Sequence, residues 1–111
     1  MPTSRRRSAA PAAGDAMHAH AAEAARLLKA LANEKRLQVL CALADGECSV
    51  GTLNTGVELS QSALSQHLAV LRQQNLVTTR RESQTIYYSI ADPTVLALLR
   101  VLRDVYCADD G

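Results

Sequence analysis

The clearest pattern of apolar and polar positions lies between residues 60 and 75. At about 100° per residue, Leu64, Leu68 and Leu71 share one narrow face, which predicts a helix packed on a core. The opposite face has no charge and carries small or amide side chains: Gln61, Ser62, Ser65, Gln66, Ala69 and Gln73. Such groups suit a helix that fits the major groove of DNA and meets base edges. On this segment alone, an ordinary surface helix low in charge is the alternative.

The neighbouring segments predict a winged helix-turn-helix. Residues 49–55 are a short helix candidate, and a turn containing Gly56 separates them from the helix just described, as in a helix-turn-helix. Residues 76–81 and 85–90 have the composition and alternation of two β-strands. The polar stretch 82–84 between them predicts the tip of a hairpin, which would be the wing.

Three further helices complete a fold that is mainly α with a β-hairpin wing. The Ala- and Leu-rich residues 18–31 predict the first helix. Ser60 can cap the helix described first, and Asn33 can cap a second helix. Asp92, followed by a proline, can cap a last helix that runs to about Ala108. The predicted inward stripe of the second helix is Leu37, Leu40, Cys41 and Ala44.

The apolar face of the last helix is unusually broad for the end of a small domain. It consists of Val95, Leu98, Leu99, Leu102, Val105 and Tyr106. So broad a face predicts a partner, and we expect the first and last helices to form a homodimer. Two recognition helices would then lie about 34 Å apart and read an inverted-repeat operator in double-stranded DNA.

Length and composition limit the number of domains and the kinds of partner that this prediction allows. The 111 residues have room for one domain, which we place at residues 18–111, after a disordered basic tail at 1–17. No apolar run reaches the roughly 18 residues of a membrane span and no signal-peptide pattern opens the chain, so we expect a cytoplasmic protein without a membrane partner. The net charge is only +1, which means that DNA binding would depend on the local placement of Arg72, Arg80 and Arg81.

Several motifs together resemble the ArsR family of winged-helix repressors. They are LANEKRL at 31–37, LSQHLAVLR at 64–72, LV at 76–77 and YY at 87–88, and the resemblance covers roughly residues 20–107. It implies a homodimeric repressor that leaves its operator when an inducer binds. It also implies DNA contacts from Gln61, Ser62, Ser65, Gln66, Arg81 and Gln84. One departure is Ser83, which stands where the family's wing often has glycine.

The metal sites of that family are not matched. Where arsenite sensors often carry a Cys-x-Cys pair, this chain has Ser49 and Gly51. Of the zinc ligands on the last helix only Asp92 is present, and an N-cap explains it better. The remaining positions hold Thr94, Val105 and Ala108. We interpret His18 and His20 as a pair of surface residues and His67 as a structural histidine packed beside the core. The sequence therefore predicts no bound metal and no cofactor.

Three cysteines remain: Cys41, Cys48 and Cys107. None forms a Cys-x-x-Cys motif, and a cytosolic chain would keep them reduced at rest. From its position on the predicted inward stripe, Cys41 is expected to be a small core residue. Cys107 lies opposite the apolar face of its helix. One branch of the family, the SqrR and BigR type, responds to sulfane sulfur through a cysteine on the second helix and one on the last. The resemblance implies that Cys41 and Cys107 are such a pair, joined by a disulfide or polysulfide link, with Cys48 an exposed bystander.

Three alternatives stay open at this point. The first is an arsenite- or metalloid-responsive repressor of the same family, in which thiolates bind the inducer. The second is a small thiol-dependent redox enzyme that uses Cys107, although no base and orienting group accompany any cysteine and we expect no enzyme activity. The third is a dimeric interaction module that does not bind DNA.

Overall fold

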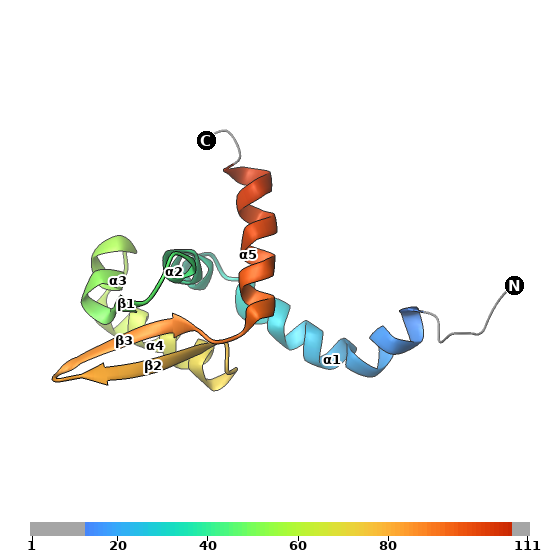
Figure 1. The fold of residues 1–111 in the computed structure, drawn as a ribbon, viewed down its shortest axis with the longest axis horizontal. Coiled ribbons are helices and arrows are strands. Elements are labelled where there is room, and N and C mark those ends of the chain that lie inside the picture. The colour runs from blue at the N-terminus through green and yellow to red at the C-terminus, as the bar shows by residue number, and fades with distance from the viewer. Residues whose placement is uncertain (1–12, 108–111) are drawn as a thin grey trace, which may run out of the picture.

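The structure, a computed structural model, describes residues 13–107. Helices make up most of it, and a small antiparallel sheet lies at one end (Figure 1). The elements in chain order are α1 (Ala13–Leu31), α2 (Glu34–Ala44), β1 (Cys48–Ser49), α3 (Val50–Gly56), α4 (Gln61–Gln73), β2 (Val77–Glu82), β3 (Thr85–Ile90) and α5 (Pro93–Tyr106). The predicted fold, mainly helical with a hairpin wing, is confirmed.

The three predicted helix caps are confirmed. Asn33, Ser60 and Asp92 have extended backbone conformations, and the side chain of each accepts a hydrogen bond from a backbone N–H in the first turn. The donating residues are Arg36 (3.0 Å), Ala63 (3.1 Å) and Thr94 (2.8 Å). Each cap satisfies an N–H that has no partner inside its helix, which defines where α2, α4 and α5 begin.

The inward stripe of α2 differs from the prediction. Val39, Leu40 and Leu43 are buried, whereas Leu37 is only half-buried and Cys41 is exposed. The reason is that α2 packs against several elements, including α4, α5 and β3. In this packing the buried face of α2 is rotated by about one residue from the predicted stripe. Cys41 is therefore not a core residue.

The sheet has three strands in the order β1-β3-β2, all antiparallel. The short strand β1 pairs Cys48 with Tyr88 and was missed in the sequence, because two residues cannot display an alternating pattern. At the tip of the β2–β3 hairpin, Ser83 has φ of 56°, in the left-handed region where glycine is most at ease. The wing thus keeps its tight turn with serine in the place of glycine.

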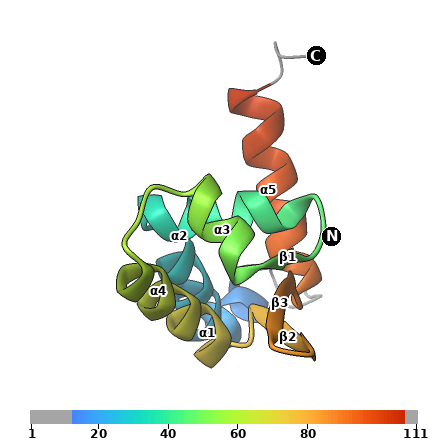
Figure 2. The same ribbon diagram turned by 90° about the vertical axis from the view of Figure 1, so that its left-hand side faces the viewer.

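Two helices extend beyond the body of the protein. The first, α1, begins at Ala13 rather than at the expected His18, consistent with the high helix propensity of its many alanines. It projects to one side, while α5 rises away from α4 and the hairpin (Figures 1 and 2). Of the predicted disordered basic tail at 1–17, residues 13–17 belong to α1, so that part of the prediction is wrong. Residues 1–12 of the tail and the last residues, 108–111, lie outside the described residues. Within 13–107, no helix is long and apolar enough to cross a membrane.

Candidate DNA interface and cysteine site

The outward face of α4 carries the residues that we expect to read DNA. Leu64, Leu68 and Leu71 are buried in the core, so the helix turns its other side to solvent. All four predicted contact residues on this helix are exposed: Gln61, Ser62, Ser65 and Gln66. His67 is half-buried beside the core face, as expected for a packed histidine.

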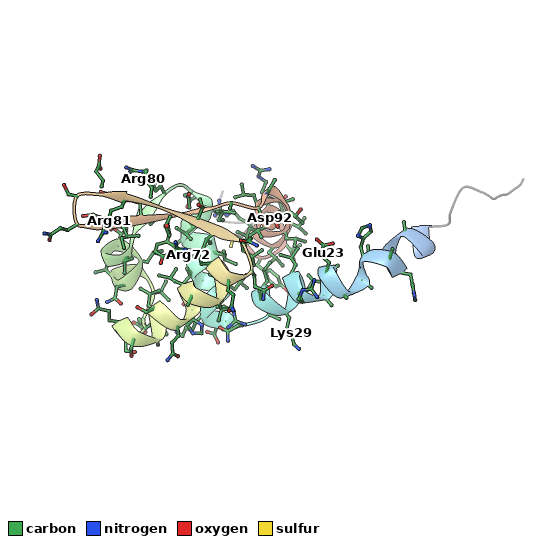
Figure 3. All side chains as sticks on the ribbon, turned by 90° about the horizontal axis from the view of Figure 1, so that it is seen from below. Glu23, Lys29, Arg72, Arg80, Arg81 and Asp92 are labelled. Atoms are coloured by element: carbon green, nitrogen blue, oxygen red, sulfur yellow. The ribbon has the colours of Figure 1, made fainter. Side chains whose placement is uncertain are left out.

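A hollow of about 480 Å³ lies between α4 and the hairpin, which we call the wing hollow. Its lining consists of Val50, Ser65, Leu68, Ala69, Arg72, Gln73, Ile86 and Tyr88. Arg72, which lies between α4 and the hairpin in Figure 3, is the one charged member of that lining. The lining of the wing hollow thus includes Ser65 and Ala69 from the outward face of α4. Figure 2 shows α4 and the β2–β3 hairpin at the same end of the molecule.

The two arginines of the hairpin differ in their surroundings. Arg80 donates two hydrogen bonds to the carboxylate of Glu47, at 2.9 and 2.7 Å, and its guanidinium lies 4.6 Å from the centre of the Tyr87 ring. The hydrogen bond from Arg80 holds the pKa of Glu47 below its ordinary value. Arg81 is exposed and has no ion-pair partner within residues 13–107. Arg80 thus already has a partner within the protein, and its contribution of positive charge to DNA stays a prediction. Arg81 and Gln84 are exposed, and Arg81 is without such a partner in the described residues.

A second group of residues joins the C-terminal end of α2 to the last turn of α5. Arg103 on α5 donates from Nη1 to Oδ1 of Asp45 at 3.2 Å, and Asp45 is the residue that ends α2. Cys107 follows α5 directly, and its backbone N–H donates to the carbonyl oxygen of Arg103 at 2.7 Å. Cys41 is one turn before Asp45 on α2, so the ion pair lies beside both cysteines.

The charges of this group act on the thiol of Cys41. Partial burial raises the pKa of the Cys41 thiol above its ordinary value, although the side chain remains exposed. The guanidinium of Arg103 opposes this rise, whereas negative charge on Cys107 and Asp45 adds to it. Cys107 is also exposed, so reagents in solution can reach both sulfur atoms. The ion pair between Asp45 and Arg103 thus joins the two parts of the chain that carry Cys41 and Cys107.

Cys48 has a different environment, and our expectation that it is an exposed bystander was wrong about its exposure. It is half-buried in β1 and packs against the core. Its Sγ lies 3.8 Å from the carbonyl oxygen of Ala42 and 3.7 Å from that of Gly46. Within the described part of the chain, no three His, Cys, Asp or Glu residues are arranged to hold a metal ion.

A recognition helix with an uncharged outer face, beside a hairpin wing, defines a winged-helix DNA-binding regulator. Residues 33–79 match the family described as "Bacterial regulatory protein, arsR family". The transcriptional activator HlyU of Vibrio cholerae is 54% identical over 91 residues, which cover 82% of this chain and 84% of that protein. The biofilm growth-associated repressor of Agrobacterium fabrum is 43% identical over 95 residues, covering 86% and 81%. This chain belongs to the ArsR family.

Solved structures agree with this assignment. Reduced HlyU from Vibrio cholerae superposes with a TM-score of 0.80 at 53% identity, covering 84% of this chain and 98% of that one. The repressor BigR from Xylella fastidiosa gives a TM-score of 0.80 at 37% identity, covering 85% and 96%. A homodimeric winged helix-turn-helix domain from Mycobacterium bovis gives 0.67 at 34% identity, covering 93% and 91%. The chain is thus a DNA-binding transcriptional regulator related to the BigR branch, and not an enzyme.

Proposed function

We propose that this protein is a homodimeric repressor that releases its operator when a sulfur link forms between Cys41 and Cys107. The observation that carries the proposal is the ion pair between Asp45 and Arg103, because Cys41 lies one turn before Asp45, Cys107 lies one turn after Arg103, and both cysteines are exposed. The relatives of the BigR branch support the regulatory role. Reactive sulfur species in the cytoplasm would be the inducer, and no bound metal or cofactor takes part.

Dimerisation would occur through an apolar groove between α1 and α5. This groove has a volume of about 270 Å³ and is lined by Leu28, Leu31, Ala32, Leu37, Leu98, Val101 and Leu102. Leu28, Val101 and Val105 leave more than half of their surface exposed in the single chain, at 55%, 57% and 66%. Burying so much apolar surface against a second copy is favourable. The homodimeric relative from Mycobacterium bovis supports this assembly.

The proposed chemistry starts with a thiolate of the protein. A low-molecular-weight persulfide, RSSH, transfers its outer sulfur to one cysteine thiolate, which becomes a persulfide while the donor leaves as the thiol RSH. The thiolate of the second cysteine attacks Sγ of the first, so that the bond from Sγ to the added sulfur breaks, a disulfide forms and the added sulfur leaves as hydrosulfide, HS⁻. The two cysteines lose two electrons in total, and the transferred sulfur gains them.

A longer bridge can form when both cysteines carry an added sulfur. The terminal sulfur of one persulfide then attacks Sγ of the other cysteine, which gives a trisulfide and again releases the added sulfur of that cysteine as HS⁻. A trisulfide spans a greater distance than a disulfide, whose Cα atoms must lie within about 7 Å. Either bridge would tie α2, which packs on α4, to α5, which borders the dimer groove. A covalent tie between these two parts can favour one spacing of the recognition helices over another.

The proposal is tested by treating the reduced protein with a sulfane-sulfur donor and measuring both mass and operator binding. We expect an intramolecular link between Cys41 and Cys107 with masses that differ by single sulfur atoms, and loss of binding to a duplex from the protein's own promoter. A thiol reductant should restore binding. Cys41→Ser and Cys107→Ser should bind DNA without responding to the donor.

Cys48→Ser is the matched control and should respond like the parent. If both Cys41→Ser and Cys107→Ser were still released by the donor, the switch would lie elsewhere. Release by arsenite but not by the donor would instead favour the metalloid-responsive alternative. A protein that shows no salt-sensitive, sequence-selective DNA binding would contradict the repressor proposal itself.

A further inference from the structure

We propose that a basic hollow between α1, α2 and α4 binds a backbone phosphate of the operator, on the side of α4 that faces away from the wing. The hollow has a volume of about 170 Å³ and is lined by Arg26, Lys29, Ala30, Arg36, Val70 and Gln74. This proposal rests on α4 being the helix that enters the DNA groove. It does not depend on the cysteine switch.

The lining of the basic hollow has an excess of positive charge. Three of its six lining residues are cationic, and the lining, drawn from residues 13–107, includes no acidic side chain. None of the three cations has an ion-pair partner in that part of the chain, in contrast to Arg80 and Arg103. Guanidinium and ammonium groups that converge on one small concave surface are suited to a phosphate group.

Arg36 is held in place by the backbone of α1. Its Nε donates to the carbonyl oxygen of Ala30 at 2.8 Å, and its Nη2 lies 3.4 Å from that of Lys29. These carbonyls belong to the last turn of α1, where partial negative charge gathers and a cation is stabilised. Arg36 is therefore oriented before any ligand arrives, while Arg26 and Lys29 on α1 are exposed and can close on an anion.

The position of the hollow on α4 points to DNA as the source of the phosphate. Arg72 lies on the flank of α4 that borders the wing hollow, and Val70 and Gln74 lie on the flank that borders the basic hollow. The outward face, with Ser62 and Gln66, separates the two flanks.

An α-helix about 10–12 Å across fills a major groove that is about 12 Å wide. The two phosphate backbones that border the groove must then run along the two flanks of the helix. One backbone would meet Arg72 and the wing, and the other would meet the basic hollow. Figure 3 shows Lys29 at the end of α1 that approaches α4.

The test uses Arg26→Gln, Lys29→Gln and the double variant, all as reduced full-length protein without a sulfur donor. Arg36 is left intact because its loss would also disturb the end of α1. Arg100→Gln is the matched control, since Arg100 is an exposed cation without an ion-pair partner in residues 13–107, on the helix that rises away from α4. Affinity is measured over a range of salt concentrations for a promoter duplex and for a random duplex.

We expect the double variant to weaken binding to both duplexes by the same factor, roughly tenfold at moderate salt. The slope of log affinity against log salt should become shallower by about 2 for a dimer, because each phosphate contact contributes about 0.9. Thermal unfolding followed by circular dichroism should show that the variant is folded, and the control should keep the parental slope.

The proposal would be overturned if the parent bound DNA and the double variant had the same slope of log affinity against log salt concentration. Weaker binding to the promoter duplex alone would also overturn the proposal, because a contact with a phosphate does not depend on the DNA sequence whereas a contact with a base does. Inorganic pyrophosphate, titrated by calorimetry, is the probe for a free anion as the alternative source. Tight binding of pyrophosphate that the double variant loses, together with an unchanged DNA slope, would assign the hollow to a small phosphorylated ligand instead of the operator.

Discussion

At the scale of single residues, the charges around Cys41 predict how readily its thiol reacts. The guanidinium of Arg103 lowers the pKa of this thiol and the carboxylate of Asp45 raises it. Arg103→Gln should therefore raise the pKa further, so that less thiolate is present at a given pH and alkylation slows. Asp45→Asn should have the opposite effect. Mass spectrometry of the Cys41 peptide after timed iodoacetamide treatment, repeated across pH, measures both.

Comparing Arg103→Gln with Asp45→Asn distinguishes an electrostatic effect on the Cys41 thiol from a structural one. Both substitutions break the same ion pair between α2 and α5. Loosening of the two helices would therefore shift the alkylation profile in the same direction in both variants, which would contradict an electrostatic control of Cys41. Opposite shifts would support it.

Gln66 is the residue from which we expect the greatest sequence selectivity. It is exposed on the outward face of α4, and its amide can form two hydrogen bonds with the edge of an adenine. Gln66→Ala should cost about 1–3 kcal/mol of binding free energy on the operator and little on random DNA. Fluorescence anisotropy with both duplexes measures the difference. Equal weakening on every sequence would mean that this face of α4 does not read bases.

At the scale of elements, we expect the two arginines of the wing to differ in role, with Arg80 stabilising the hairpin and Arg81 binding DNA. Arg80 ties β2 to Glu47, which lies just before β1, and so holds the hairpin against the body. Arg81 is exposed without an ion pair in the described residues, so its charge is available to a phosphate. Arg81→Ala should weaken operator and random DNA alike and flatten the salt dependence by about 1 per protomer. Binding titrations at several salt concentrations test this.

Glu47→Gln provides the comparison for the wing. It removes the partner of Arg80 while keeping the size of the side chain. We expect this variant to keep its salt slope or to make it steeper, because a positive charge is released near the hairpin. A loss of slope equal to that of Arg81→Ala would contradict the division of roles between the two arginines.

At the scale of the whole molecule, we expect the apolar surface of α5 to form part of the core and part of the proposed dimer interface. Val95 and Leu99 are buried within one chain, whereas Val101 and Val105 are exposed beside the groove with α1. Val101→Glu should prevent dimerisation, because a carboxylate would be buried without a partner in the interface. Light scattering after size-exclusion chromatography should report a monomer, and operator binding should be lost with it.

Arg100→Glu is the control on the same turn of α5, since Arg100 is not part of the lining of the groove. It should remain a dimer at the same protein concentration. Dimers of equal stability in both variants would place the interface on another surface.

The sequence by itself determined the elements that depend on short-range rules. The two faces of α4, the caps Asn33, Ser60 and Asp92, and the hairpin all follow from periodicity and turn chemistry within a few residues. The boundaries shifted by only a few residues, and the two-residue strand β1 was missed because its partner strand, β3, defines it.

Tertiary structure alone decided the surroundings of the functional groups. The Arg80–Glu47 and Arg103–Asp45 pairs join residues that are 33 and 58 positions apart, and no local pattern predicts such contacts. The same holds for the exposure of Cys41, which depends on how α2 turns when several elements pack around it. The basic hollow likewise needs three helices at once. Charges and thiols acquire their roles from neighbours that only packing brings together, whereas helices and turns are encoded along the chain.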